Sequence, residues 1–218
     1  MTNIPKKTVI LWDWDNTLVD TFDAIFSAQN VMLNFYGIPK LTKDDAIKSM
    51  NKSWRNIMKE LIGDEKLVEA RNIYLDAYKK NSSNLTFKQG ALDALKKANE
   101  LQYINILASN KAGDILRDEV KRLDVAHYFD YIIGAEDTPH HKPSKSFTDV
   151  ALSNFNYEKI YSIGDRLADI KMGHNYKNGY AILVGSIPNI NEFDEDKPDY
   201  VFNDMIGVTN FLEKITKK

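Results

Sequence analysis

The sequence predicts an α/β protein built on a doubly wound parallel sheet. Short apolar runs alternate with segments in which apolar residues recur at helical spacing. The runs show little polar alternation, which is typical of strands that helices cover on both faces. In addition, the stretch from Thr21 to about residue 80 contains no good strand, which predicts a helical insertion into the α/β unit.

Five apolar runs are predicted to form the sheet, and each is rich in residues that favour strands. They are residues 8–12 (TVILW), 103–108 (YINILA), 131–135 (YIIGA), 159–164 (KIYSIG) and 180–185 (YAILVG). Between them, residues 91–101 and 113–123 place apolar side chains on one helix face. For a third helix, Ser146 and Asp149 match a capping box, which predicts a start there and an end near residue 154.

The strand-free stretch contains three helical patterns. The first is an apolar stripe that begins at Ala24, includes Val31 and Phe35, and ends before Gly37. Two further stripes follow, over residues 54–61 and 68–77.

Two places mark the ends of this insertion. Strand-like sequence stops near Val19, and the polar segment NSSN (81–84) precedes the return to α/β sequence. We therefore expect a core of residues 1–19 and 83–218 and an inserted helical domain of residues 20–82.

The composition excludes several classes of protein. With 29 Lys and Arg against 31 Asp and Glu, the net charge is -2, so a nucleic acid is not expected as an obligate partner. The absence of cysteine excludes disulfides and thiolate chemistry and fits a reducing compartment. Asp13 interrupts the first apolar run, which is too short for a signal peptide or a membrane span. We expect a cytoplasmic protein without a membrane partner, either a monomer or a homodimer.

Polar residues follow the apolar runs where the strands are expected to end. Ligands bind beyond the carboxyl ends of the strands in an open parallel sheet, so these residues are expected to share one site. They are Asp13, Asp15, Ser109, Asn110, Lys142, Asp165 and Asp169. Several carboxylates in one place repel each other, and Mg²⁺, which prefers oxygen ligands, would relieve that repulsion. The acids therefore predict a magnesium site.

The first two acids suggest covalent chemistry. Residues two apart on an extended strand face the same side, so Asp13 and Asp15 are expected to point into the site with Trp14 turned away. One carboxylate can act as a nucleophile while the other moves protons.

Four segments, in this order, resemble the motifs of the haloacid dehalogenase superfamily. They are DWDNT (13–17), ILASN (106–110), HKPS (141–144) and IGDRLAD (163–169). The insertion lies where that family places its helical cap, and TLVDT and SNK are similar to the phosphoglycolate phosphatase branch. The resemblance covers essentially the whole chain. It implies a Rossmann-like core and a Mg²⁺-dependent phosphatase, a phosphoric monoester hydrolase. The substrate would be a small phosphorylated metabolite, a phosphoglycolate-like phosphomonoester, hydrolysed through an aspartyl-phosphate intermediate.

The resemblance also implies residue roles. Asp13 would be the nucleophile and a metal ligand, and Asp15 the general acid and base, with its backbone carbonyl on the metal. Asp165 would be a metal ligand, and Asp169 would support the metal site. The residues expected to bind phosphate are Ser109, Asn110 and Lys142.

Other readings stay open at this point. A phosphosugar mutase shares the core chemistry, and a catalytically silent binding or regulatory protein could use the same fold. A dehalogenase fits less well, because that branch generally lacks an acid at the position of Asp15. Two positions depart from the family pattern, His141 and Lys145, and their roles are open, as is that of His140. Exposed loop positions are expected for the two histidines, and Lys111 is interpreted as a surface or structural residue.

The insertion contains one candidate for substrate recognition. The segment SMNKSWRN (49–56) carries Lys52 and Arg55 beside Trp54, between two predicted helices. Helical caps of the family often place a specificity loop here, so Lys52 or Arg55 is expected to contact the non-reacting end of the substrate. Arg55 is preferred because a guanidinium matches a planar carboxylate. The alternative is a solvated helix face.

Overall fold

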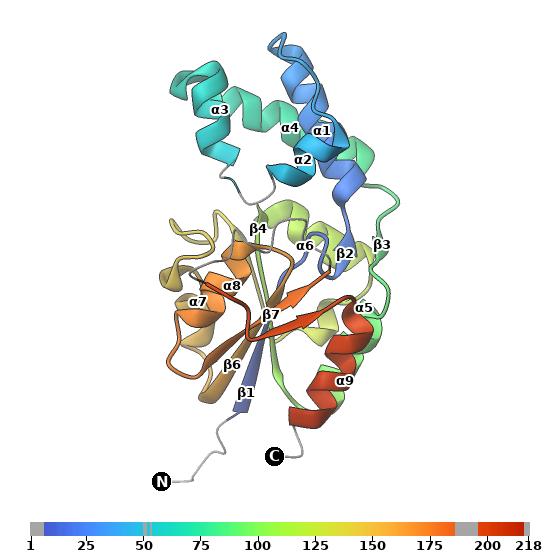
Figure 1. Cartoon of the computed structure of the whole chain (residues 1–218), viewed down its shortest axis with the longest axis vertical. Coiled ribbons are helices and arrows are strands. Elements are labelled where there is room, and N and C mark those ends of the chain that lie inside the picture. Colours follow the sequence, from blue (N-terminus) through green and yellow to red (C-terminus); the bar gives the residue numbers. More distant parts are fainter. Residues whose placement is uncertain (1–6, 50–51, 53, 186–195, 216–218) are drawn as a thin grey trace. The chain divides into compact units, whose positions relative to one another are not determined.

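The computed structural model describes residues 7–49, 52, 54–185 and 196–215 of the 218-residue chain. The chain forms two compact units, one of residues 1–19 with 87–218 and one of residues 20–86. That these units are folding domains with the expected boundaries, after residues 19 and 82, stays a prediction. Figure 1 shows the first unit as a sheet with helices and the second as helices alone.

The α/β unit contains a six-stranded sheet in which every neighbouring pair is parallel. The strand order is β5-β4-β1-β6-β7-β8. The strands are β1 (Lys7–Trp12), β4 (Ile104–Ala112), β5 (Tyr131–Ala135), β6 (Tyr157–Gly164), β7 (Gly179–Val184) and β8 (Tyr200–Phe202). The chain moves from β1 to one edge and then returns to build the other half, so the sheet is doubly wound, as predicted.

Five α-helices of this unit lie on the two faces of the sheet (Figure 1). They are α5 (Ala91–Glu100), α6 (Gly113–Arg122), α7 (Lys145–Leu152), α8 (Leu167–His174) and α9 (Met205–Ile215), and a 3₁₀ turn covers Ala126–Tyr128. The capping box expected at Ser146 is wrong. Ser144 precedes the helix, and the Asp149 carboxylate instead accepts a hydrogen bond from the Lys145 ammonium at 2.8 Å.

The core of the α/β unit follows from the two-residue period of β1. Val9 and Leu11 point to one face, where they pack with Phe147 of α7 and Met172 of α8. All four are buried. These contacts place α7 and α8 on the same face. Because α7 follows β5 and α8 follows β6, the loop before each helix lies at the carboxyl end of the parallel sheet.

The inserted unit is helical. Its elements are α1 (Phe22–Phe35), α2 (Lys43–Lys48), α3 (Trp54–Ile62), a 3₁₀ turn (Asp64–Lys66) and α4 (Leu67–Asn81). Met32 and Met58 lie in its small core. Part of the predicted apolar pattern is not buried, since Val31, Phe35 and Leu61 are 48%, 60% and 51% exposed. Helical spacing predicted these helices correctly, but some of the apolar positions in the predicted stripes are exposed rather than buried.

A pair of short strands, β2 (Val19–Asp20) and β3 (Thr86–Phe87), forms a separate two-stranded sheet. The chain passes from one unit to the other within these two strands.

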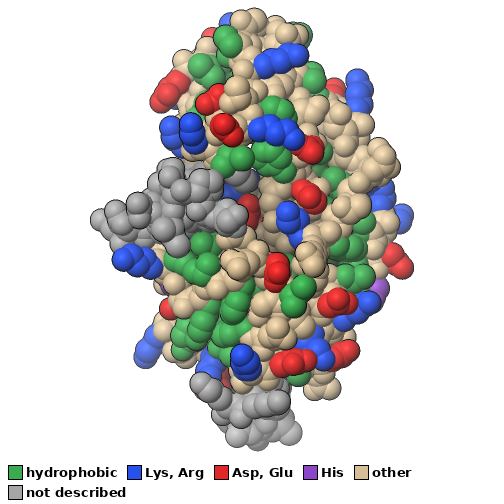
Figure 2. All heavy atoms as spheres, turned by 45° about the vertical axis from the view of Figure 1, so that its right-hand side comes forward, with side chains coloured by type: hydrophobic (Ala, Val, Ile, Leu, Met, Phe, Trp, Pro, Cys, Tyr) green, Lys and Arg blue, Asp and Glu red, His purple; other side chains and the backbone are tan. Residues whose placement is uncertain are grey.

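The charges are mixed on the described surface. On the face shown in Figure 2, the Lys and Arg side chains of the described residues are interspersed with Asp and Glu, in line with the net charge of -2. Within the described part of the chain, no helix combines the length and apolar character needed to cross a bilayer.

Candidate active site

The loop after β1 positions Asp13. The Asp13 amide still donates to the Ile163 carbonyl of β6 at 2.9 Å, so the residue continues the line of the strand. The chain then turns through Asn16, which has a φ of 63°, and the amides of Leu18 and Val19 both donate to the Trp14 carbonyl. This turn brings back Thr17, whose hydroxyl donates to Asp13 Oδ2 at 2.9 Å. Asp13 therefore has one carboxylate oxygen held by its own loop.

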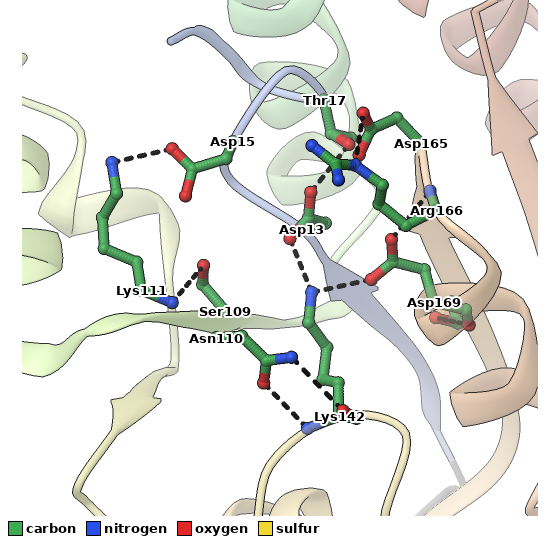
Figure 3. Close-up of polar contacts among 11 residues, drawn as sticks. Asp13, Asp15, Thr17, Ser109, Asn110, Lys111, Lys142, Asp165, Arg166 and Asp169 are labelled. Atoms are coloured by element: carbon green, nitrogen blue, oxygen red, sulfur yellow. Dashed lines mark hydrogen bonds and ion pairs between the residues drawn. The ribbon is translucent and has the colours of Figure 1, made fainter. Parts of the chain in front are cut away.

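The other oxygen of Asp13 faces Lys142, which comes from the loop between β5 and α7. The Lys142 ammonium donates to Asp13 Oδ1 and, at 2.7 Å, to Asp169 Oδ1 (Figure 3). All three side chains are at least nine-tenths buried. Burial lowers the pKa of Lys142, but the carboxylates of Asp13 and Asp169 outweigh that effect and raise it above its ordinary value. Lys142 is therefore a permanent cation between two acids.

Asp165 and Asp169 follow β6 at the start of α8. A Cβ on Gly164 would lie 2.1 Å from Asp169 Cγ, so only glycine lets the Asp169 side chain pass beside this backbone. Asp169 Oδ2 accepts from the Arg166 amide at 3.1 Å and thereby caps the helix. Asp165 Oδ2 pairs with Arg166 Nε at 3.2 Å.

Oxygen atoms of Asp13, Asp165 and Asp169 lie within 4.8 Å of one another. Burial, assisted by the Asp13 charge, raises the pKa of Asp165 to about 6 and that of Asp169 to about 7. Asp165 Oδ1 is buried and has no hydrogen-bond partner among the described residues. A set of hard oxygen donors with one buried oxygen unpaired fits Mg²⁺. The predicted contribution of Asp15, through its backbone carbonyl, stays a prediction.

Ser109 and Asn110 lie where the pairing of β4 with β5 loses its register, between Ala108 and Ala112. The buried Ser109 hydroxyl accepts from the Lys111 amide at 3.2 Å. The Asn110 side chain accepts from the Lys142 amide at 2.8 Å and donates to the Lys142 carbonyl at 3.2 Å. Asn110 therefore ties β4 to the lysine loop, and its direct contact with phosphate stays a prediction.

Asp15 has different partners from Asp13. Its carboxylate forms an ion pair with Lys111 at 2.7 Å, and Figure 3 shows it directed toward Lys111 rather than Lys142. Lys111 also pairs with Glu119 of α6 at 2.7 Å, and the indole of Trp14 donates to the same Glu119 oxygen at 2.7 Å. Because β1 ends at Trp12, strand geometry does not set the direction of Asp15, and the expectation that Asp13 and Asp15 point into one site stays a prediction.

Comparison with known proteins identifies the chain. Residues 10–181 match the family model described as haloacid dehalogenase-like hydrolase. The chain belongs to this family. A pyrophosphatase named PpaX from Listeria monocytogenes is 26% identical, over 92% of this chain and 94% of that protein. A phosphoglycolate phosphatase from Aquifex aeolicus is 28% identical, over 83% of this chain and 90% of that protein.

Solved structures support the fold. A haloacid dehalogenase-like family hydrolase from Streptococcus pneumoniae has a TM-score of 0.80 at 20% identity, covering 94% of this chain and 98% of the other. This agrees with the predicted α/β core and helical insertion.

Several site neighbours of this haloacid dehalogenase-like hydrolase were not predicted. Lys111, interpreted as a surface or structural residue, is only 7% exposed, so the surface alternative is wrong. Glu119 is fully buried, and its position offered a signal, because it lies four residues from Ile115 and from Leu123 on the apolar face of a helix. Arg166, adjacent to a predicted ligand, had no comparable signal.

The remaining candidates lie outside these contacts. His140 and His141 are exposed, and neither belongs to the metal-ligand group found among the described residues. Lys145 pairs with Asp149 on the surface of α7. In the inserted unit, Lys52 is exposed, and Arg55 is 75% exposed with its guanidinium 3.8 Å from Asp64. Met50, Asn51 and Ser53 of the same segment lie outside the described residues. Substrate contact by Lys52 or Arg55 stays a prediction.

Proposed function

We propose that this protein is a Mg²⁺-dependent phosphatase that hydrolyses a small phosphorylated metabolite through a phosphoaspartate on Asp13. The observation that supports it best is the buried group of Asp13, Asp165 and Asp169 with Lys142 among them, at the carboxyl ends of parallel strands. The family and the names of its relatives, a pyrophosphatase and a phosphoglycolate phosphatase, also support phosphoryl transfer at this group of residues.

In the first step, an oxygen of Asp13 attacks phosphorus, and the bond from phosphorus to the leaving oxygen breaks. Thr17 and Lys142 hold the two Asp13 oxygens, so the nucleophile needs little reorientation. Lys142 also places a positive charge beside the phosphoryl oxygens, where charge develops. Asp15 donates a proton to the leaving oxygen.

In the second step, water attacks the phosphorus of phosphoaspartate while Asp15 accepts its proton, and release of phosphate restores Asp13. Asp13, Asp165 and Asp169 would hold Mg²⁺, with Asp15 contributing its backbone carbonyl. When bound, the ion neutralises phosphoryl charge and the mutual repulsion of the acids. The inserted helical unit would act as a cap that excludes water from the first step.

Metal removal tests the proposal directly. Purified protein treated with EDTA is expected to release no phosphate from p-nitrophenyl phosphate, phosphoglycolate or pyrophosphate, and added Mg²⁺ should restore turnover on at least one. Because Mg²⁺ binds only the folded site, it should also raise the melting temperature. An Asp165→Asn variant should show a smaller rise, whereas Asp118→Asn, an exposed acid of α6, should behave as wild type. Full activity in excess EDTA would contradict a metal-dependent mechanism.

The names of the relatives suggest the substrate class. Phosphoglycolate and pyrophosphate each carry a second anionic group beyond the reacting phosphate. We infer that this protein also acts on a substrate with an anionic far end. Arg55, and next Lys52, are our candidates for contacting it, because both present positive charge on the inserted unit.

The contribution of Arg55 and Lys52 to substrate specificity can be measured with two substrates. Arg55→Ala should lower kcat/KM for the anionic substrate about tenfold or more and leave that for p-nitrophenyl phosphate, which has no anionic far end, nearly unchanged. Lys52→Ala should act in the same direction, and Arg71→Ala serves as a matched control in the same unit. If neither Arg55 nor Lys52 changes the ratio of the two constants, both belong to a solvated surface.

A further inference from the structure

A second polar chain lies beside the group around Asp13. It runs from the Trp14 indole to Glu119, from Glu119 to Lys111 and from Lys111 to Asp15, and each contact is 2.7 Å. The exposed fraction of the side chains rises along it, from 0% for Glu119 through 7% for Lys111 to 20% for Asp15. This series of polar contacts therefore leads from the interior to Asp15, the residue proposed to transfer protons.

We propose that Lys111, anchored by Glu119, is a positioning residue that orients the Asp15 side chain, so that its protonated carboxyl group can give a proton to the leaving group. The inference rests on the proposed function, specifically on Asp15 as the proton donor.

The stability of the fold does not explain this arrangement. A buried ion pair contributes about as much to the stability of a fold as apolar residues of the same volume, because the cost of removing both charges from water offsets their attraction. Glu119 occupies an apolar helix face that a leucine would fill without any partner. The Trp14 indole instead holds the Glu119 carboxylate, Glu119 holds Lys111, and the Lys111 ammonium then faces Asp15.

The Asp15 carboxylate depends on Lys111 for its orientation. The loop after β1 holds the Asp13 carboxylate through Thr17, but it makes no such contact with the Asp15 carboxylate among the described residues. The Thr17 hydroxyl is committed to Asp13, and the backbone contacts of the turn hold the Asp15 main chain but not its carboxylate. A carboxylate that rotates freely spends less time within reach of the leaving oxygen, and proton transfer requires that reach.

Leaving-group dependence separates positioning of Asp15 from a general structural role. An alkyl phosphate such as phosphoglycolate leaves as an alkoxide and requires the proton, whereas 2,4-dinitrophenyl phosphate leaves as a stable phenolate and does not. The constant kcat/KM reports only steps up to transfer of the phosphoryl group, so slow hydrolysis of the intermediate does not mask the difference.

The experiment compares both substrates, with saturating Mg²⁺, in Lys111→Met, Lys111→Arg, Glu119→Gln and Asp15→Asn. Lys111→Met should lower kcat/KM for the alkyl phosphate about 10- to 100-fold and that for the dinitrophenyl ester less than threefold, as expected for partial loss of general acid catalysis. Lys111→Arg, which keeps the charge, should recover most of the alkyl activity. Glu119→Gln, which leaves Lys111 less firmly held, should show a smaller selective loss. Lys121→Met, an exposed lysine of α6, is the matched control.

The outcomes separate the role of Lys111 as a positioning residue from the role of Asp15 as the proton donor. Equal losses on both substrates, or no loss, in Lys111→Met and Glu119→Gln would overturn the positioning role while Asp15→Asn still shows a selective loss. If Asp15→Asn itself loses both activities equally, its role as proton donor fails, and the role of Lys111 fails with it. If Lys111→Met does not fold, Lys111→Arg and Glu119→Gln decide the question by the same ratio.

Discussion

Asp13→Asn is expected to lower turnover by at least about 10⁴-fold, because an amide is too weak a nucleophile to attack phosphorus. The fold should persist. Asparagine has nearly the same shape, can accept from Lys142 through its oxygen and can donate to the Thr17 hydroxyl through its nitrogen. Phosphate release from the preferred substrate measures the loss, and mass spectrometry of acid-quenched wild type should show one phosphoryl group on the peptide that contains residue 13.

The stability of this variant is a separate check. Removing one of three clustered acids reduces their repulsion, so the melting temperature of Asp13→Asn in EDTA should equal or exceed that of wild type. Near-normal turnover in a folded Asp13→Asn protein would remove Asp13 as the nucleophile, and a phosphoryl group found on another residue would do the same.

Lys142→Met is expected to have the largest effect on stability. It leaves Asp13 and Asp169 buried without their cation, and breaking a buried ion pair in this way costs about 3–5 kcal/mol. Burial raises the pKa of Asp169 above its ordinary value, and without the Lys142 charge this pKa would rise further in the folded state. The loss should therefore be greatest at about pH 8 and decrease toward about pH 5, where protonation of Asp169 removes an unpaired charge.

Urea denaturation in EDTA at several pH values measures this effect. The matched control is Lys145→Met, whose pair with Asp149 on α7 is half exposed and should contribute about 1 kcal/mol or less. Equal stabilities of the two variants at pH 8 would show that the buried acids do not depend on Lys142. Activity of Lys142→Met should also fall strongly, because the phosphoryl oxygens lose their nearest cation.

Much of the α/β core was predictable because buried parallel strands leave a strong signal. Each of the five predicted runs corresponds to a strand, since covering both faces of the sheet requires an uninterrupted apolar segment. The edge strand β8 and helix α9 were missed. β8 is partly exposed at the edge of the sheet, so its side chains need not be apolar on both faces.

The inserted unit was predictable in kind but less so in detail. Helical spacing correctly identified α1, α3 and α4. It did not identify α2, which has only six residues and is held by a capping box of Thr42 and Asp45 rather than by an apolar stripe. A helix as short as α2 offers too few positions for a periodic apolar pattern to be recognised in the sequence.

The sequence by itself determined the order of the strands along the chain and which polar residues follow them, because both depend on neighbouring residues. It could therefore predict that Asp13, Lys142, Asp165 and Asp169 share the carboxyl end of one sheet. Only the tertiary structure decided which charge pairs with which. Trp14 and Glu119 are 105 positions apart, and their contact exists because α6 packs against β4 and β5 of the sheet. An ion pair depends on where two side-chain ends lie within an ångström or so, and that is set by the packing of whole elements rather than by any local pattern.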